Sequence, residues 1–146
     1  MKKYIVFLFA LIILAGCGSG GMIPPDAKIT ITSPDFPYVE TDLGGGNQLH
    51  TSHFTIQLMD NAGKPLASER DIDIYFPYAA PDAADLTQFY DGAIKVNSPF
   101  RTRTDSNGQY ILRMDFKSGG TPRLSYTANL EVKSGPVSAT FAVSVN

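Results

Sequence analysis

From about residue 28 onward, apolar and polar residues alternate along this 146-residue sequence, and no other pattern restricts its fold as strongly. Successive side chains of a β-strand point to opposite faces of a sheet, so alternation produces strands with one apolar and one polar face. We therefore predict an all-β fold in which about seven strands form two antiparallel sheets packed as a β-sandwich. The apolar positions of the seven predicted strands are Ile29 and Ile31; Phe54, Ile56 and Leu58; Ile72, Ile74 and Phe76; Ile94 and Val96; Tyr110, Leu112, Met114 and Phe116; Leu124, Tyr126, Ala128, Leu130 and Val132; and Ala139, Phe141, Val143 and Val145.

Turn-forming residues separate these segments. Residues 60–65, 105–108 and 118–120 place Gly or Asn where a connection needs positive φ, as hairpin turns do. Between Pro77 and Gly92 the alternation is interrupted, and residues 81–90 begin with a proline and an aspartate, which are start signals of a short helix. We predict a helix there. No internal repeat is visible, as is typical of a single domain.

The first sixteen residues differ in composition from the rest of the chain. Two lysines precede an unbroken apolar run at residues 4–14, and Ala15 and Gly16 are as small as a signal peptidase requires. The run is shorter than the roughly 20 residues that a transmembrane helix needs. Residues 14–17, Leu-Ala-Gly-Cys, resemble the lipobox of bacterial lipoproteins, in which the cysteine thiol is diacylglycerated and cleavage then frees its amino group.

This resemblance implies that residues 1–16 are a cleaved signal peptide and that Cys17 is the lipidation site, which anchors the mature protein to a membrane. No cofactor is expected beyond this covalent lipid. The competing interpretations are an ordinary secretory leader and a buried strand at residues 4–14. Gly18 follows the cysteine; in lipoproteins an acidic residue there is associated with retention at the inner membrane, so the resemblance implies the outer membrane.

Composition indicates where the folded domain begins and which partners and cross-links it lacks. Residues 18–21 are Gly and Ser and two prolines follow shortly after, so we predict a flexible tether at residues 17–27 and a folded domain at residues 28–146. Without the two leader lysines the chain has ten basic residues against 14 acidic ones and no basic stripe, so we expect no nucleic-acid partner. Cys17 is the only cysteine, so the apolar core must hold the domain without a disulfide.

The turns and the strands around them resemble a known family. Residues 54–66, FTIQLMDNAGKPL, run a strand into a D-x-x-G-x-P turn; a strand at residues 72–74 follows; and residues 104–110, TDSNGQY, lead through a T-D-x-x-G turn into another strand. The same elements occur in the same order in bacterial immunoglobulin-like domains of the invasin and intimin type, which the chain resembles over most of residues 28–146. The resemblance implies an immunoglobulin-like sandwich, here in a single copy. Transthyretin-like and regulatory carboxypeptidase-like domains are the competing folds.

Candidate metal ligands are few. His50 and His53 are the only histidines, and a transition metal shared between them would need a third ligand such as Glu40 or Asp42. We interpret both histidines as solvated residues. The residue types of a calcium loop are present without the bidentate glutamate of an EF-hand, and turn formation accounts for them: Asp60, Asp71, Asp73, Asp105, Asn107 and Gly108. We therefore predict no metal site.

No catalytic residues are predicted, because the chain has neither a G-x-S-x-G elbow nor a Cys–His pair; a metal-dependent enzyme is the remote alternative. Aromatic residues gather around the interrupted segment, and exposed rings offer a partner a large contact area at modest entropic cost. The competing interpretation is that some of these rings cap the open end of the sandwich. The candidate partner-binding residues are Tyr75, Tyr78, Phe89 and Tyr90.

These features together predict a lipid-anchored module of the cell envelope that binds or assembles by contact with an envelope protein, without catalysis. The alternative is an adhesin-like surface lipoprotein that binds polysaccharide.

Overall fold

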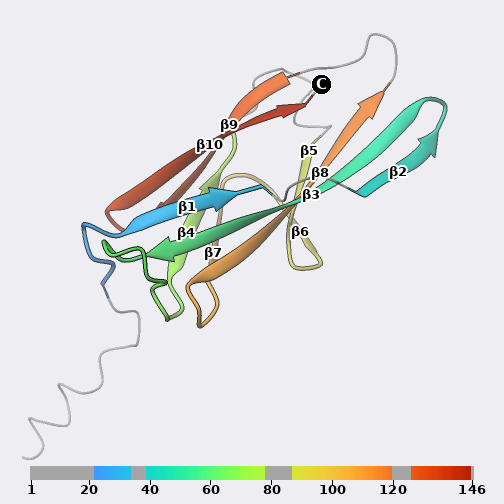
Figure 1. The fold of residues 1–146 in the computed structure, drawn as a ribbon. Helices are drawn as coiled ribbons and strands as arrows, with labels where there is room; N and C mark the ends of the chain where they lie inside the picture. The colour runs from blue at the N-terminus through green and yellow to red at the C-terminus, as the bar shows by residue number, and fades with distance from the viewer. Residues whose placement is uncertain (1–21, 34–38, 78–86, 120–125, 146) are drawn as a thin grey trace, which may run out of the picture.

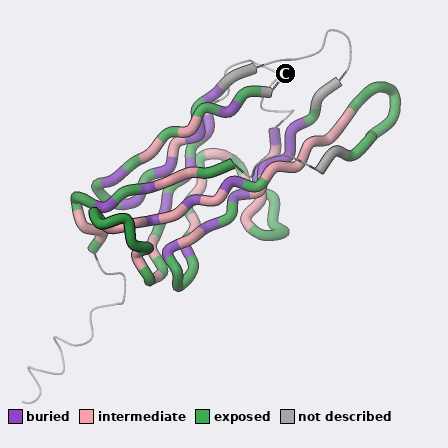
Figure 2. Tube along the Cα trace, viewed as in Figure 1, coloured by how far each residue is buried: buried purple, intermediate pink, exposed green. Residues whose placement is uncertain are grey.

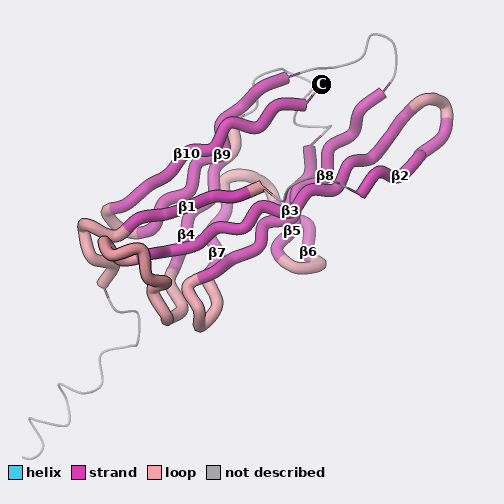
Figure 3. Tube along the Cα trace, viewed as in Figure 1, coloured by secondary structure: helices cyan, strands magenta, loops and turns pink. Residues whose placement is uncertain are grey.

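The computed structural model describes residues 22–33, 39–77, 87–119 and 126–145, which form ten β-strands (Figure 3). Within these four ranges no helix could span a membrane. The all-β prediction is confirmed. The strands are β1 (Lys28–Thr32), β2 (Val39–Gly44), β3 (Asn47–Met59), β4 (Asp71–Tyr75), β5 (Thr87–Asp91), β6 (Ile94–Val96), β7 (Phe100–Arg103), β8 (Gln109–Gly119), β9 (Tyr126–Ser134) and β10 (Val137–Val145).

Two antiparallel sheets pack against each other as a sandwich (Figure 1). The larger sheet has the order β1-β3-β8-β5-β6, with β2 also paired to β3, and the smaller has the order β10-β9-β4-β7. With β1, β3 and β8 on one side and β10, β9, β4 and β7 on the other, the arrangement is that of an immunoglobulin-like sandwich. The predicted fold class is confirmed, and β2, β5 and β6 extend the larger sheet beyond this seven-strand core.

Buried and more exposed residues alternate along the strands (Figure 2). The buried apolar side chains form the core between the two sheets. Two edge-to-face ring pairs join the sheets: Phe54 with Phe141, 5.7 Å between centroids, and Phe76 with Phe89, 5.5 Å. Each fully buried aliphatic side chain contributes about 1.5–3 kcal/mol relative to an exposed one. Those with 0% exposure are Ile56, Leu58, Ile72, Ile74, Leu112, Met114, Leu130 and Val132.

The predicted strands differ from the observed ones in detail. β3 begins at Asn47, well before Phe54, the first apolar position predicted for it, because its first half pairs with β2 and β8 where burial is only partial. Ile94 is 71% exposed, so of the two apolar positions of the short strand β6 only Val96 packs against the core. Leu124 lies outside the described residues.

The predicted helix at residues 81–90 is wrong where the structure describes it. Thr87–Asp91 form β5, which pairs with β8 through Thr87↔Phe116 and Phe89↔Met114. Residues 78–86 lie outside the described residues. Thr87 and Phe89 are 3% and 1% exposed, so pairing with β8 and burial of this face outweigh the local start signals of a helix.

The turns after β3 and after β7 have the same hydrogen-bond geometry. In each D-x-x-G-x loop one carboxylate oxygen of the aspartate, Asp60 or Asp105, accepts the N–H groups two and four residues later at 2.8–2.9 Å. The loop glycines, Gly63 and Gly108, have φ values of 79° and 73°. The turn residues singled out in the sequence therefore form two closed, matching loops.

The β7–β8 turn packs against the connection between β3 and β4. Thr104 exchanges two hydrogen bonds with the Arg70 backbone, donating its N–H to the carbonyl at 3.0 Å and accepting the Arg70 N–H on its hydroxyl at 2.9 Å. The Gln57 side-chain amide donates to the Gly108 carbonyl oxygen at 3.0 Å. A Cβ at Gly108 would lie 2.3 Å from the carbonyl oxygen of Leu66. These contacts join the end of β3 and the starts of β4 and β8 into one unit.

Residues 22–27 lie at the same end of the sandwich as these turns, and the β2–β3 hairpin lies at the other end (Figure 1). Ile23 packs against the core, and Ala27 is 7% exposed. The Asn61 amide donates to the Asp26 carboxylate at 2.8 Å. Packing of the domain thus begins before Lys28, the residue at which the sequence pattern places the start of the folded domain.

Candidate functional site

The four aromatic residues predicted to bind a partner do not form one surface. Tyr75, on β4 of the smaller sheet, is 43% exposed. Tyr78 lies outside the described residues. Phe89, on β5 of the larger sheet, is 1% exposed and packs against Phe76, so it belongs to the core and offers a partner no contact surface. Tyr90 is half-buried on the outer face of the same strand.

Strand alternation and sheet topology explain this separation. Phe89 and Tyr90 are neighbours in sequence, so their side chains point to opposite faces of β5. β4 and β5 belong to different sheets, so Tyr75 and Tyr90 face outward on opposite sides of the sandwich. Tyr75, Phe89 and Tyr90 therefore occupy three separate layers.

The outer face of the larger sheet carries a connected group of side chains around Tyr90. Arg113 donates two hydrogen bonds to the Asp115 carboxylate, at 2.9 and 2.7 Å, and the Thr51 hydroxyl donates a third at 3.0 Å. The Arg113 guanidinium lies over the Tyr90 ring, 4.4 Å from its centroid, and the Tyr90 hydroxyl donates to Gln88 at 3.0 Å. We call these residues the Arg113 cluster: Thr51, Gln88, Tyr90, Arg113 and Asp115.

Asp115 is the buried residue of the Arg113 cluster. Its side chain is 3% exposed although its position on β8 faces outward. A buried carboxylate costs several kcal/mol unless it is paired, and Arg113 and Thr51 supply the pairing. The hydrogen bonds to Asp115 hold the pKa of Arg113 above its usual value. Nη1 of Arg113 takes no part in these bonds, and the side chain is 37% exposed, so a pre-oriented guanidinium can donate to an incoming acceptor.

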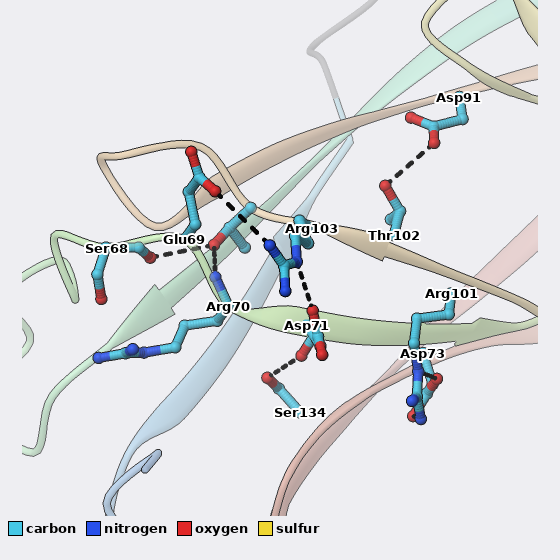
Figure 4. Close-up of polar contacts among 11 residues, drawn as sticks. Ser68, Glu69, Arg70, Asp71, Asp73, Asp91, Arg101, Thr102, Arg103 and Ser134 are labelled. Atoms are coloured by element: carbon cyan, nitrogen blue, oxygen red, sulfur yellow. Dashed lines mark hydrogen bonds and ion pairs between the residues drawn. The ribbon is translucent and has the colours of Figure 1, made fainter. Parts of the chain in front are cut away.

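The outer face of the smaller sheet carries exposed ion pairs instead (Figure 4). Arg101 donates to Asp73 at 2.7 and 3.0 Å, and Arg103 donates to Asp71 at 2.7 Å. The hydrogen bond from Arg101 lowers the pKa of Asp73. All four side chains are 52–68% exposed, so screening by solvent leaves little net stabilisation from either pair.

A third polar group joins the two sheets between the end of β5 and the edge strand β7. Asp91 accepts hydrogen bonds from the Tyr110 hydroxyl at 3.0 Å and from the Thr102 hydroxyl at 3.1 Å. Burial raises the pKa of Tyr110, and the nearby Asp91 carboxylate raises it further. This arrangement serves the fold, since β8 and β7 belong to different sheets.

The loop and β4 aspartates considered as metal ligands are engaged elsewhere. The loop aspartates accept backbone N–H groups, and the two aspartates of β4 pair with arginines. His50 and His53 are three positions apart on β3, so their side chains lie on opposite faces. Across the ranges that the structure describes, no group of three or more His, Cys, Asp and Glu side chains is placed to hold a metal ion.

The sequence analysis does not identify the Arg113 cluster, although a signal for it is present. Between the buried residues of β8 lie Ile111, Arg113, Asp115 and Lys117. An arginine and an aspartate two positions apart share one strand face, where they can pair. Ile111 stands out in the same series, as an apolar residue 52% exposed on a face expected to be polar.

Comparison with known families finds a match at the N-terminus of the chain. Residues 1–17 match the family model of the prokaryotic membrane lipoprotein lipid attachment site. This match supports anchoring of the chain to a membrane through a lipid. The match ends at Cys17, the predicted lipidation site, which lies outside the residues that the structure describes.

No curated protein matches the chain by sequence. Among solved structures it is similar to PapD-like domain 7 of human CEP192, an ASH/PapD-like domain. The two are 16% identical, the similarity covers 88% of this chain and 90% of that chain, and the TM-score is 0.42.

Proposed function

We propose that the chain is a lipid-anchored, non-catalytic module of the cell envelope that binds an envelope protein by surface contact. The position of the anchor carries this proposal. Cys17 is five residues before Met22, and Ile23 already packs against the core. Five residues of extended chain reach at most about 18 Å. A lipid on Cys17 would therefore hold one end of the sandwich near the bilayer and leave both outer sheet faces and the β2–β3 hairpin available for contact.

Several features support a binding role over a catalytic one. The Asp91 and Asp115 carboxylates accept hydrogen bonds that connect neighbouring strands, and the Asp60 and Asp105 carboxylates close loops, so these four groups serve the fold.

The pair of D-x-x-G loops also supports the invasin-type interpretation of the domain. Because Gly18 follows the anchor in place of an aspartate, we propose the outer membrane as its location.

Membrane fractionation tests the anchor and its location. In the producing cell the wild-type chain should separate with the outer membrane, and Cys17→Ser should lose its lipid mass and leave the membrane fraction. Gly18→Asp is the matched control for location, and it should move the protein to the inner membrane. An unlipidated wild-type protein, identified by mass spectrometry, would contradict the proposal.

Cross-linking in intact cells tests the protein contact. The anchored wild-type chain should form a defined, protease-sensitive adduct with a second envelope protein, and Cys17→Ser should form much less of it. Adducts that survive protease treatment and disappear after glycan digestion would instead favour the polysaccharide-binding alternative.

A further inference from the structure

The two outer faces of the sandwich differ in charge. On the smaller sheet, carboxylates and cations balance: Asp71, Asp73 and Glu131 against Arg101, Arg103 and Lys133. On the larger sheet, Asp115 is the only carboxylate that the described strands place outward, and Arg113 already neutralises it. The cations on this side form what we call the basic face: Lys28, Lys95, Arg113 and Lys117, with exposed His53 among them.

The basic face contrasts with the chain as a whole, which is acidic without its leader. Lys95 lies opposite Tyr90 across β5 and β6, His53 lies opposite Arg113 across β3 and β8, and Lys117 lies beyond Asp115 on β8. With its one carboxylate buried, this face presents a positive potential that attracts a negatively charged surface.

The centre of the basic face has the composition of a protein interface. Ile111 is 52% exposed, two positions from Arg113 on the same face of β8. Arg113 is held in place by Asp115 and Tyr90, so it loses little entropy when it binds. Tyrosine and arginine are the residue types that carry most binding energy in protein interfaces, and lysines form a charged rim around them here. An exposed isoleucine at the centre favours a protein over a sugar polymer, because it gains only by burial against another apolar group.

We infer that the basic face docks an acidic surface of a partner protein, with Ile111 and Arg113 at the centre of the contact. This inference rests on the proposed protein-binding function and adds its surface and the charge of its partner. The partner supplies carboxylates to Nη1 of Arg113 and to the lysines, and an apolar side chain to Ile111. Binding should weaken as the salt concentration rises, because the rim charges are exposed.

Site-specific photocross-linking in the producing cell tests this surface with the full lipidated chain. A photoreactive phenylalanine analogue replaces either Ile111 or, as the control on the opposite face with similar exposure, Tyr75. Position 111 should give a protease-sensitive adduct, and position 75 should give none. Lys95→Glu combined with Lys117→Glu should reduce the adduct at least about tenfold, whereas Lys133→Glu on the smaller sheet should leave its yield unchanged.

The outcomes distinguish a failure of the proposed docking surface from a failure of the proposed protein-binding function. An adduct at position 75 and none at 111 overturns the basic face but leaves a protein-binding function in place. An adduct at 111 that resists protease, as a bilayer or glycan adduct would, overturns the protein partner. No adduct at either position overturns the basic face, and the protein-binding function is overturned as well only if cross-linking of the intact anchored chain also yields no protease-sensitive adduct. Ile111→Ser changes no charge and should reduce the yield of the protease-sensitive adduct in the cross-linking of the intact anchored chain. Unfolding in urea confirms that each variant folds.

Discussion

Replacing Gly108 by alanine should destabilise the sandwich far more than replacing Gly63, although the two glycines hold equivalent positions in matching loops. Both have positive φ, where a Cβ costs about 1–2 kcal/mol. Their surroundings differ. A Cβ at Gly63 meets nothing within 4 Å, whereas a Cβ at Gly108 would lie 2.3 Å from the carbonyl oxygen of Leu66.

A side-chain rotation cannot relieve this contact, because the opposing atom belongs to the backbone. The β7–β8 turn must move away from the β3–β4 connection, which breaks two hydrogen bonds to the Gly108 carbonyl oxygen. The donors are the Leu58 N–H at 2.9 Å and the Gln57 amide at 3.0 Å. At about 0.5–1.5 kcal/mol each, these bonds add to the backbone strain. We expect a loss of about 3–4 kcal/mol for Gly108→Ala and about 1–2 kcal/mol for Gly63→Ala.

Urea unfolding at pH 7 of a soluble 22–146 fragment, which contains every described strand, measures both losses. The comparison requires equal m values for the two variants, so that a shift in midpoint reports stability. If both variants lost the same free energy within about 0.5 kcal/mol, the packing of Gly108 against Leu66 would not be the reason for glycine at this position.

Arg113→Ala leaves the buried Asp115 carboxylate without its main partner, so urea unfolding should show a loss of about 3 kcal/mol. Arg101→Ala breaks an exposed pair that solvent screens and should cost far less stability. Equal losses for the two variants would argue against a special role for Arg113. The Gln109 N–H lowers the pKa of Asp105, so its stabilising contribution is complete above about pH 4 and is lost at lower pH. Asp105→Asn should therefore flatten the acid side of the stability curve, and an unchanged slope would count against this. The raised pKa of Tyr110 means that the unfolded chain loses this proton first, so stability should fall as the pH passes about 10. Tyr110→Phe should remove that decline in unfolding measured from pH 8 to 11, and a persistent decline would refute the assignment.

Features that depend only on neighbouring residues can be predicted from the chain itself. Alternation at Phe54, Ile56 and Leu58 indicates which side of a strand is buried, because side-chain direction repeats every two residues in any strand. The D-x-x-G loops at Asp60 and Asp105 follow from hydrogen bonds within five residues. The predicted lipidation of Cys17 likewise rests on a local motif, and the family match covers residues 1–17.

Pairing between distant strands decided the rest. Residues 87–90 are a strand because β8 lies beside them, and Tyr75 and Tyr90 face opposite ways because β4 and β5 joined different sheets. Arg113 and Asp115 lie next to Thr51 only through the register of β8 against β3, some sixty residues away in sequence. Such contacts depend on which backbone edges meet, and a pattern that repeats every two residues specifies the buried face of a strand but not its neighbour.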